Sequence, residues 1–162
     1  MFKSIRGACY SQYKKRQFNS AKRDFARAFY IDTSSVYSSY SLATLYNLEE
    51  KNDSAFYFIN KAIRLKSIDY HGIFAKELDI PYDELVFFRG VIFCEAGLLQ
   101  KAKKDFWGSI SQGHNSGEAF AYLAVVYSNE NKLDSACYYY KKAMALGYES
   151  QLDSALLMRC KY

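Results

Sequence analysis

The sequence predicts an all-α protein, a right-handed solenoid of about four helix hairpins followed by a short C-terminal capping helix. Three observations support this fold class. A pattern of small and aromatic residues returns at a spacing of 34 residues, with an alanine at the same place in each copy. The apolar positions within each copy follow helical spacing. Only one proline and 8 glycines occur among the 162 residues, so long stretches are free to be helical.

The alanines that mark the copies, here called the anchor alanines, set the domain organisation. Ala21, Ala55, Ala102 and Ala136 lie 34, 47 and 34 residues apart, so 13 extra residues separate the second copy from the third. We therefore expect one domain over residues 1–162. Its repeats lie at about 2–35, 36–69, 83–116 and 117–150, with an insertion at 70–82 and a terminal helix at 151–162.

The elements follow in order from this register. The first copy is the weakest, and a serine or threonine among Thr33–Ser35 caps the first helix of the second copy. The insertion either plugs a widened junction with apolar residues such as Ile80 or lengthens a binding surface, and Pro81 precedes the next helix. Gly113 and Gly147 follow the second helices of the last two copies, where they can act as left-handed caps.

The fourth copy shows most clearly why each unit is a hairpin. Phe120, Leu123, Ala124 and Tyr127 share one face of a first helix, and a second helix follows from Leu133. The polar bend Ser128-Asn129-Glu130-Asn131 between them is long enough only for an antiparallel turn. Such a hairpin cannot cover its own apolar face and must stack on its neighbours.

This pattern resembles the tetratricopeptide repeat, whose 34-residue unit has small residues where its two helices approach closely and aromatic residues beside them. The resemblance covers the four copies, although Gln12 stands where an aromatic residue is usual. It implies a protein-binding scaffold whose first helices line a concave groove. The inward faces here lack the Lys, Asn and Arg set with which the chaperone-binding branch grips a terminal carboxylate.

On this resemblance, the groove would take an apolar, aromatic-bearing peptide segment or partner helix, with tyrosine hydroxyls setting its register. The alternative is that several of these side chains pack against the adjacent repeat. The expected partner-binding residues are Tyr10, Tyr37, Tyr40, Thr44, Phe87, Val91, Tyr122 and Val125.

Residues that support catalysis or cofactor binding are scarce. The two histidines, His71 and His114, lie in inter-repeat connections without a second ligand at metal-binding spacing. Glycine-rich phosphate-binding motifs are absent from the sequence. The adjacent carboxylates Glu49-Glu50 and Asp83-Glu84 are expected at the surface, as is Arg89. We therefore expect no enzyme activity, metal or cofactor.

The charge distribution gives a second hypothesis for the partner. Residues 1–27 hold eight basic residues and one acidic residue, whereas residues 28–162 hold 14 basic and 16 acidic residues. This basic end is either a solvated helix face or a site for nucleic acid or an anionic surface. A third hypothesis is homo-oligomerisation through the groove or an end surface.

The cysteines and the N-terminus suggest a compartment. Cys9, Cys94, Cys137 and Cys160 form no C-x-x-C pair, and a chain of this size does not need disulfides for stability. We therefore expect reduced thiols, with Cys137 as a small buried apolar side chain. The basic N-terminus has no apolar signal segment, which favours a cytoplasmic protein, either whole or a fragment of a longer chain.

Overall fold

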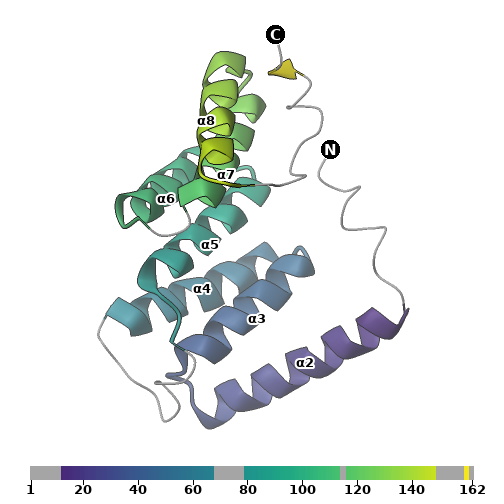
Figure 1. The fold of residues 1–162 in the computed structure, drawn as a ribbon. Helices are drawn as coiled ribbons and strands as arrows, with labels where there is room; N and C mark the ends of the chain where they lie inside the picture. Colours follow the sequence, from purple (N-terminus) through teal and green to yellow (C-terminus); the bar gives the residue numbers. More distant parts are fainter. Residues whose placement is uncertain (1–11, 68–78, 114–115, 149–158, 161–162) are drawn as a thin grey trace. The chain divides into compact units, whose positions relative to one another are not determined.

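The structure, a computed structural model, describes residues 12–67, 79–113, 116–148 and 159–160, with side chains from residue 17 onward (Figure 1). The described residues hold α-helices and no strand, which confirms the all-α fold class. The helices are α2 (Gln12–Ile31), α3 (Val36–Leu48), α4 (Asn52–Ser67), α5 (Tyr82–Glu95), α6 (Leu99–Ser111), α7 (Ser116–Asn129) and α8 (Leu133–Ala145).

The chain divides into two compact units, Met1–Asp79 and Ile80–Tyr162. In the first unit, α3 packs against α4 as a hairpin and α2 packs against α3. In the second unit, the hairpins α5–α6 and α7–α8 are joined by contacts between α6 and α7. Each unit therefore joins the second helix of one repeat to the hairpin of the next. The single domain over residues 1–162 stays a prediction.

The three hairpins turn in the same way, at the place that the repeat predicts. The residue five positions before each anchor alanine is left-handed, with φ of 59°, 75° and 60° at Glu50, Gly97 and Asn131. The next backbone N–H donates to the carbonyl five residues earlier, at distances of 3.0, 2.8 and 2.9 Å. This hydrogen bond ends a helix with its carbonyls satisfied. The recurring geometry confirms three of the repeat positions.

Small residues let the two helices of each hairpin approach. The anchor alanines Ala55, Ala102 and Ala136 are fully buried. Twelve residues before them, the first helices carry Ala43, Gly90 and Ala124, all of which are also buried. A Cβ atom on Gly90 would lie 2.8 Å from Cε1 of Phe106, so this hairpin has no room for a larger residue.

Several local predictions are confirmed. Ser35 caps α3 by accepting a hydrogen bond from the backbone N–H of Ser38 at 3.1 Å. Gly113 and Gly147 are left-handed, with φ of 77° and 76°, and end α6 and α8. Pro81 immediately precedes α5. Ile80 is buried, and most of the insertion lies outside the described residues.

The first repeat differs from the expected hairpin. Lys15 and Arg16, the residues six and five before Ala21, should form its turn, but both lie within the continuous helix α2. Neither is a glycine or an asparagine, the residues that most readily adopt the left-handed conformation of such a turn. The second helix of this repeat is therefore longer than predicted. Residues 1–11 lie outside the described part of the chain.

Two charged residues expected at the surface are held inside the α5–α6 hairpin. Arg89 donates from Nε and from its second terminal nitrogen to the carboxylate of Asp105, at 2.6 and 2.8 Å. Asp105 is only 5% exposed, and its hydrogen bonds raise the pKa of Arg89. Asp83, in the first turn of α5, is also buried. A buried carboxylate needs such partners, which explains why Arg89 turns inward.

The expectation of reduced cysteines is wrong for two of them. Cys137 on α8 forms a disulfide with Cys160, and their Cα atoms are 5.3 Å apart. Cys160 packs beside Ala136 and Tyr140, so chain folding brings together two thiols that are 23 residues apart. Cys94 is free and buried, and this burial raises its pKa to about 12. Of the predicted terminal helix, residues 151–158 lie outside the described part.

Candidate functional site

The predicted groove residues of the first unit lie along α3. Tyr37, Tyr40 and Thr44 are half-buried, so each keeps part of its side chain accessible. The ring of Tyr37 meets that of Phe25 on α2 edge-on, at a centroid distance of 5.8 Å. The hydroxyl of Thr44 donates to the carbonyl of Tyr40 at 3.1 Å. Tyr10 lies outside the described residues.

The groove residues of the second unit are largely in its core, which corrects the expectation that they face an open groove. Phe87, Val91 and Val125 are 6%, 6% and 4% exposed. The Phe87 ring packs against Phe106 and Tyr122 at centroid distances of 5.7 and 5.5 Å. Because α5 packs against both α6 and α7, its apolar residues are covered on more than one side.

Tyr122 itself is half-buried, with its ring stacked on Phe106 at 5.4 Å. Burial is the main cause of the raised pKa of its hydroxyl, which stays protonated as a hydrogen-bond donor. Whether any of these side chains meets a partner stays a prediction.

A cluster that sequence reasoning missed joins α2 to the α3–α4 hairpin, and we call it the first junction cluster. The Lys22 ammonium donates to Glu49 at 2.6 Å and lies 4.1 Å from the centre of the Tyr46 ring. Lys51 pairs with the same carboxylate at 3.0 Å. Tyr46 stacks on Phe58 at 5.4 Å. The hydrogen bond from Lys22 is the largest cause of the lowered pKa of Glu49.

The second unit repeats this arrangement 81 residues later, in what we call the second junction cluster. Lys103 donates to Glu130 at 2.7 Å and lies 5.1 Å from the centre of the Tyr127 ring. Lys132 pairs with Glu130 at 3.0 Å, and Tyr127 stacks on Tyr139 at 5.1 Å. The hydrogen bond from Lys103 lowers the pKa of Glu130 most. The signal was present in the sequence, as the same lysine, glutamate and tyrosine positions in two copies.

The corresponding positions between the second and third repeats cannot form such a cluster. Phe56 stands where the other junctions have Lys22 and Lys103, and Ala96 stands where they have a glutamate. The chain divides into its two units at this same interval. The ion-paired clusters thus belong to junctions within a unit.

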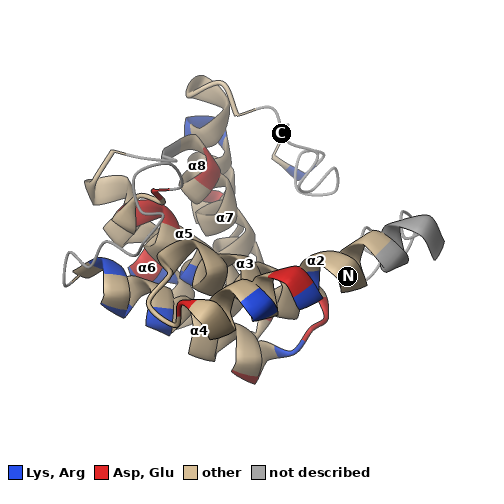
Figure 2. Cartoon of the chain, turned by 90° about the horizontal axis from the view of Figure 1, so that it is seen from below, with Lys and Arg blue, Asp and Glu red and all other residues tan. Residues whose placement is uncertain are grey.

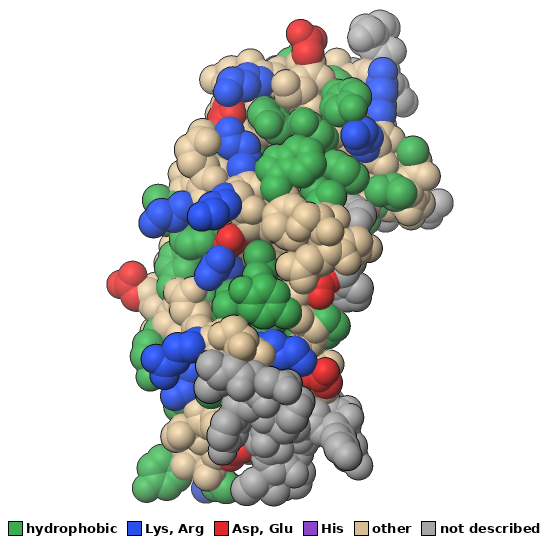
Figure 3. All heavy atoms as spheres, turned by 90° about the vertical axis from the view of Figure 1, so that its left-hand side faces the viewer, with side chains coloured by type: hydrophobic (Ala, Val, Ile, Leu, Met, Phe, Trp, Pro, Cys, Tyr) green, Lys and Arg blue, Asp and Glu red, His purple; other side chains and the backbone are tan. Residues whose placement is uncertain are grey.

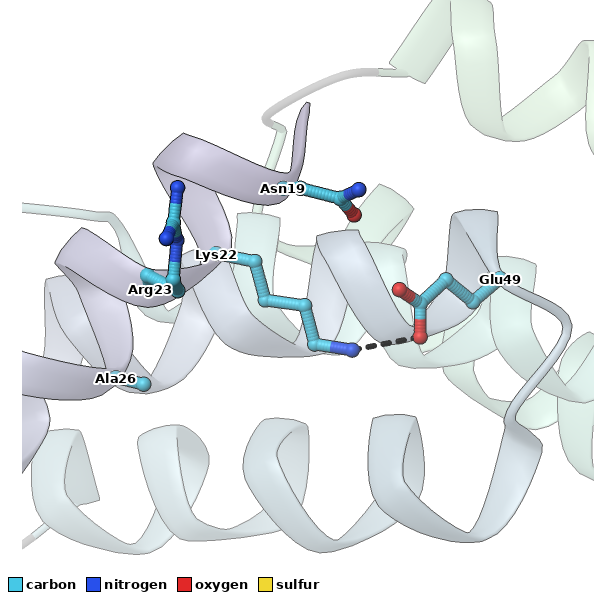
Figure 4. A pocket seen from close by; sticks show the side chains of 5 residues that line it. All are labelled: Asn19, Lys22, Arg23, Ala26 and Glu49. Atoms are coloured by element: carbon cyan, nitrogen blue, oxygen red, sulfur yellow. Dashed lines mark hydrogen bonds and ion pairs between the residues drawn. The ribbon is translucent and has the colours of Figure 1, made fainter. Parts of the chain in front are cut away.

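A shallow pocket lies beside the first junction cluster, on the surface of α2. It has a volume of about 720 Å³ and is lined by Asn19, Lys22, Arg23, Ala26 and Glu49 (Figure 4). The Lys22–Glu49 ion pair forms one side of the pocket, and Ala26 lies one helical turn from Lys22 along α2. The pocket therefore combines charged groups with a small apolar side chain.

The predicted basic end is only partly described. The side chains of Lys14, Lys15 and Arg16 lie outside the described residues, and Lys22 is paired with Glu49. The described part of α2 carries basic and acidic positions (Figure 2).

Other kinds of site were also sought. Among the described residues, no three His, Cys, Asp or Glu side chains gather as a metal ion would require. No helix in the described part of the chain is both long and apolar enough to cross a membrane.

Comparison with known proteins defines the fold. No protein-family model and no curated protein matches the sequence. Among solved structures, one of MamA has a TM-score of 0.63 at 20% identity and covers 79% of this chain and 67% of its own. The structure of Pseudomonas aeruginosa pilF has a TM-score of 0.68 at 17% identity. The chain has a tetratricopeptide-repeat fold.

This likeness concerns the fold alone. The match to pilF covers 91% of this chain but only 60% of pilF, so this tetratricopeptide-repeat chain spans less than two thirds of that protein. A second MamA structure matches over 84% of this chain, again at 20% identity.

Proposed function

We propose that this chain is a non-enzymatic scaffold that binds another protein. The observation that carries the proposal is the exposure of large apolar and aromatic side chains on a tetratricopeptide-repeat fold. Figure 3 shows hydrophobic side chains that reach the surface and are bordered by Lys and Arg. The most exposed in the first unit are Tyr30, Ile31 and Tyr57, and those in the second include Tyr138, Met144 and Leu146.

The partner should present an apolar or aromatic segment. Tyrosine suits such recognition because it offers a large contact area and a hydroxyl at a low cost in conformational entropy. Tyr37 and Tyr40 are the predicted groove residues of the first unit that keep accessible rings. We therefore place part of the partner contact on α3, with Thr44 beside it. Tyr122 is the corresponding candidate in the second unit.

The test is capture of partners from a native extract on the immobilised chain, followed by mass spectrometry. We expect a protein that stays bound when the salt concentration is raised, because apolar contacts depend little on ionic strength. A Tyr40→Ala variant should lose this protein, and Lys141→Ala, which changes an exposed residue on α8, should retain it.

Two other results would oppose the proposal. Capture of nucleic acid that disappears steeply with salt would favour the hypothesis of a phosphate-binding basic end. Light scattering that shows a stable oligomer, with no captured protein, would favour self-assembly.

A further inference from the structure

The two junction clusters differ at one position on their outer side. Five residues after the anchor alanine, the second unit carries Trp107 and the first carries Ala26. The Trp107 ring meets Phe120 and Tyr139 edge-on, at centroid distances of 6.1 and 5.7 Å. It thus covers Tyr139, the ring on which the second junction cluster is stacked.

One of these two covering rings has a substitute in the first unit. Phe120 stacks on Tyr139 at 6.0 Å and lies beneath the Lys142 ammonium, 5.3 Å away. In the first unit Ser39 stands at the position of Phe120, but Phe29 of α2 supplies a ring instead. Phe29 meets Phe58 at 5.3 Å and lies 4.9 Å from the Lys61 ammonium.

The position of Trp107 has no such substitute in the pocket residues. Ala26 is exposed and lines the pocket of about 720 Å³. The charged pair beside it is also more exposed. The side chains of Lys22 and Glu49 are 20% and 22% exposed, compared with 15% and 12% for Lys103 and Glu130. The first unit thus has a vacant place where the second unit holds an indole.

The surface next to this place is apolar and basic. A second pocket of about 510 Å³ shares Ala26 and is lined further by Arg27, Tyr30 and Ile31. Tyr30 and Ile31 are 87% and 79% exposed, which is unusual for large apolar side chains. Arg23 and Arg27, on either side of Ala26 in the sequence, are also exposed. An aromatic side chain could enter at Ala26 while neighbouring carboxylates meet the two guanidinium groups.

We propose that the α2 surface around Ala26 docks an acidic protein segment that inserts one aromatic side chain into the place corresponding to Trp107. This inference rests on the proposed function, because it names one site and the chemistry of the partner. Glu49 at the pocket wall has a lowered pKa and is ionised at neutral pH. A negative charge beside a place for one ring suits a protein side chain better than a phosphate chain.

The experiment measures fluorescence anisotropy of a labelled acidic peptide, EEWDD, titrated with the full chain. The Ala26→Trp variant fills the place from within, as Trp107 does in the second unit. We expect it to weaken peptide binding at least tenfold while its melting temperature is unchanged or higher. Ala145→Trp is the matched control, because it adds the same ring at an exposed position on α8. It should bind the peptide as the natural chain does.

A second pair of variants tests the charges. Replacing Arg23 and Arg27 with glutamine should weaken binding several-fold and reduce its dependence on salt. Arg64→Gln, on the exposed side of α4, should leave both unchanged. The peptide EEADD, which lacks the aromatic ring, should bind at least tenfold more weakly than EEWDD to the natural chain.

Three results would overturn the inference. The first is equal peptide affinity in Ala26→Trp and the natural chain. The second is displacement of the peptide by single-stranded oligothymidine at lower concentration than by unlabelled EEWDD. The third is a concentration-dependent dimer that Ala26→Trp abolishes, because a second copy would then occupy the site. If Ala26→Trp still captures the native partner while peptide binding fails, only this inference is wrong and the scaffold function stands.

Discussion

Replacing Gly90 with alanine tests the packing of the α5–α6 hairpin. The added Cβ would lie 2.8 and 2.9 Å from two ring carbons of Phe106 and 3.2 Å from Cβ of Asp105. Phe106 cannot move aside easily, because it is fully buried and its ring contacts Phe87 and Tyr122. Overpacking of this kind costs about 1–3 kcal/mol. The better helix propensity of alanine returns at most about 1 kcal/mol.

We therefore expect Gly90→Ala to lower the free energy of unfolding by about 1–2 kcal/mol, as measured by urea denaturation. Gly108→Ala is the matched control, because its Cβ would meet only Val86 Cγ1, at an ordinary 3.6 Å. This control should be neutral or stabilising by up to about 1 kcal/mol. A smaller side chain at Phe106, as in Phe106→Leu, should reduce the cost of the Gly90 change. Stabilisation by Gly90→Ala similar to that in the control would refute the packing argument.

Three further predictions concern other parts of the structure. The lowered pKa of Glu130 means that its contribution to stability is complete above its unfolded pKa of about 4.3 and is lost as pH falls through the folded value. Glu130→Gln should therefore destabilise at pH 7 and much less at pH 3, in urea midpoints measured at both. Phe87→Ala should cost about 3–5 kcal/mol because the ring is buried, whereas the half-buried Tyr40→Ala should cost clearly less. Equal melting temperatures for these two variants would contradict the assigned burial. Cys137→Ser should lower the melting temperature of the oxidised protein and remove the effect of dithiothreitol on it.

The helices, the hairpin turns and the helix caps could be predicted because they depend on neighbours in the sequence. The 34-residue spacing of the anchor alanines located three hairpins, and Gly113 and Gly147 were recognisable as left-handed caps. Helical periodicity and turn chemistry act over a few residues, so the chain itself carries the information. The weak first copy shows where this reasoning fails, because α2 runs through the expected turn.

The sequence by itself determined the fold class, the repeat register and the small residues at close helix contacts. Only the tertiary structure decided which apolar residues are buried, because Phe87 is covered by rings from two other helices. It also decided which charges pair, since Lys22 meets a carboxylate 27 residues away, and which thiols bond. Such contacts depend on how helices from different repeats pack, and the periodicity of a single helix does not specify that packing. The vacant place beside Ala26 became visible only when the two packed junctions could be compared.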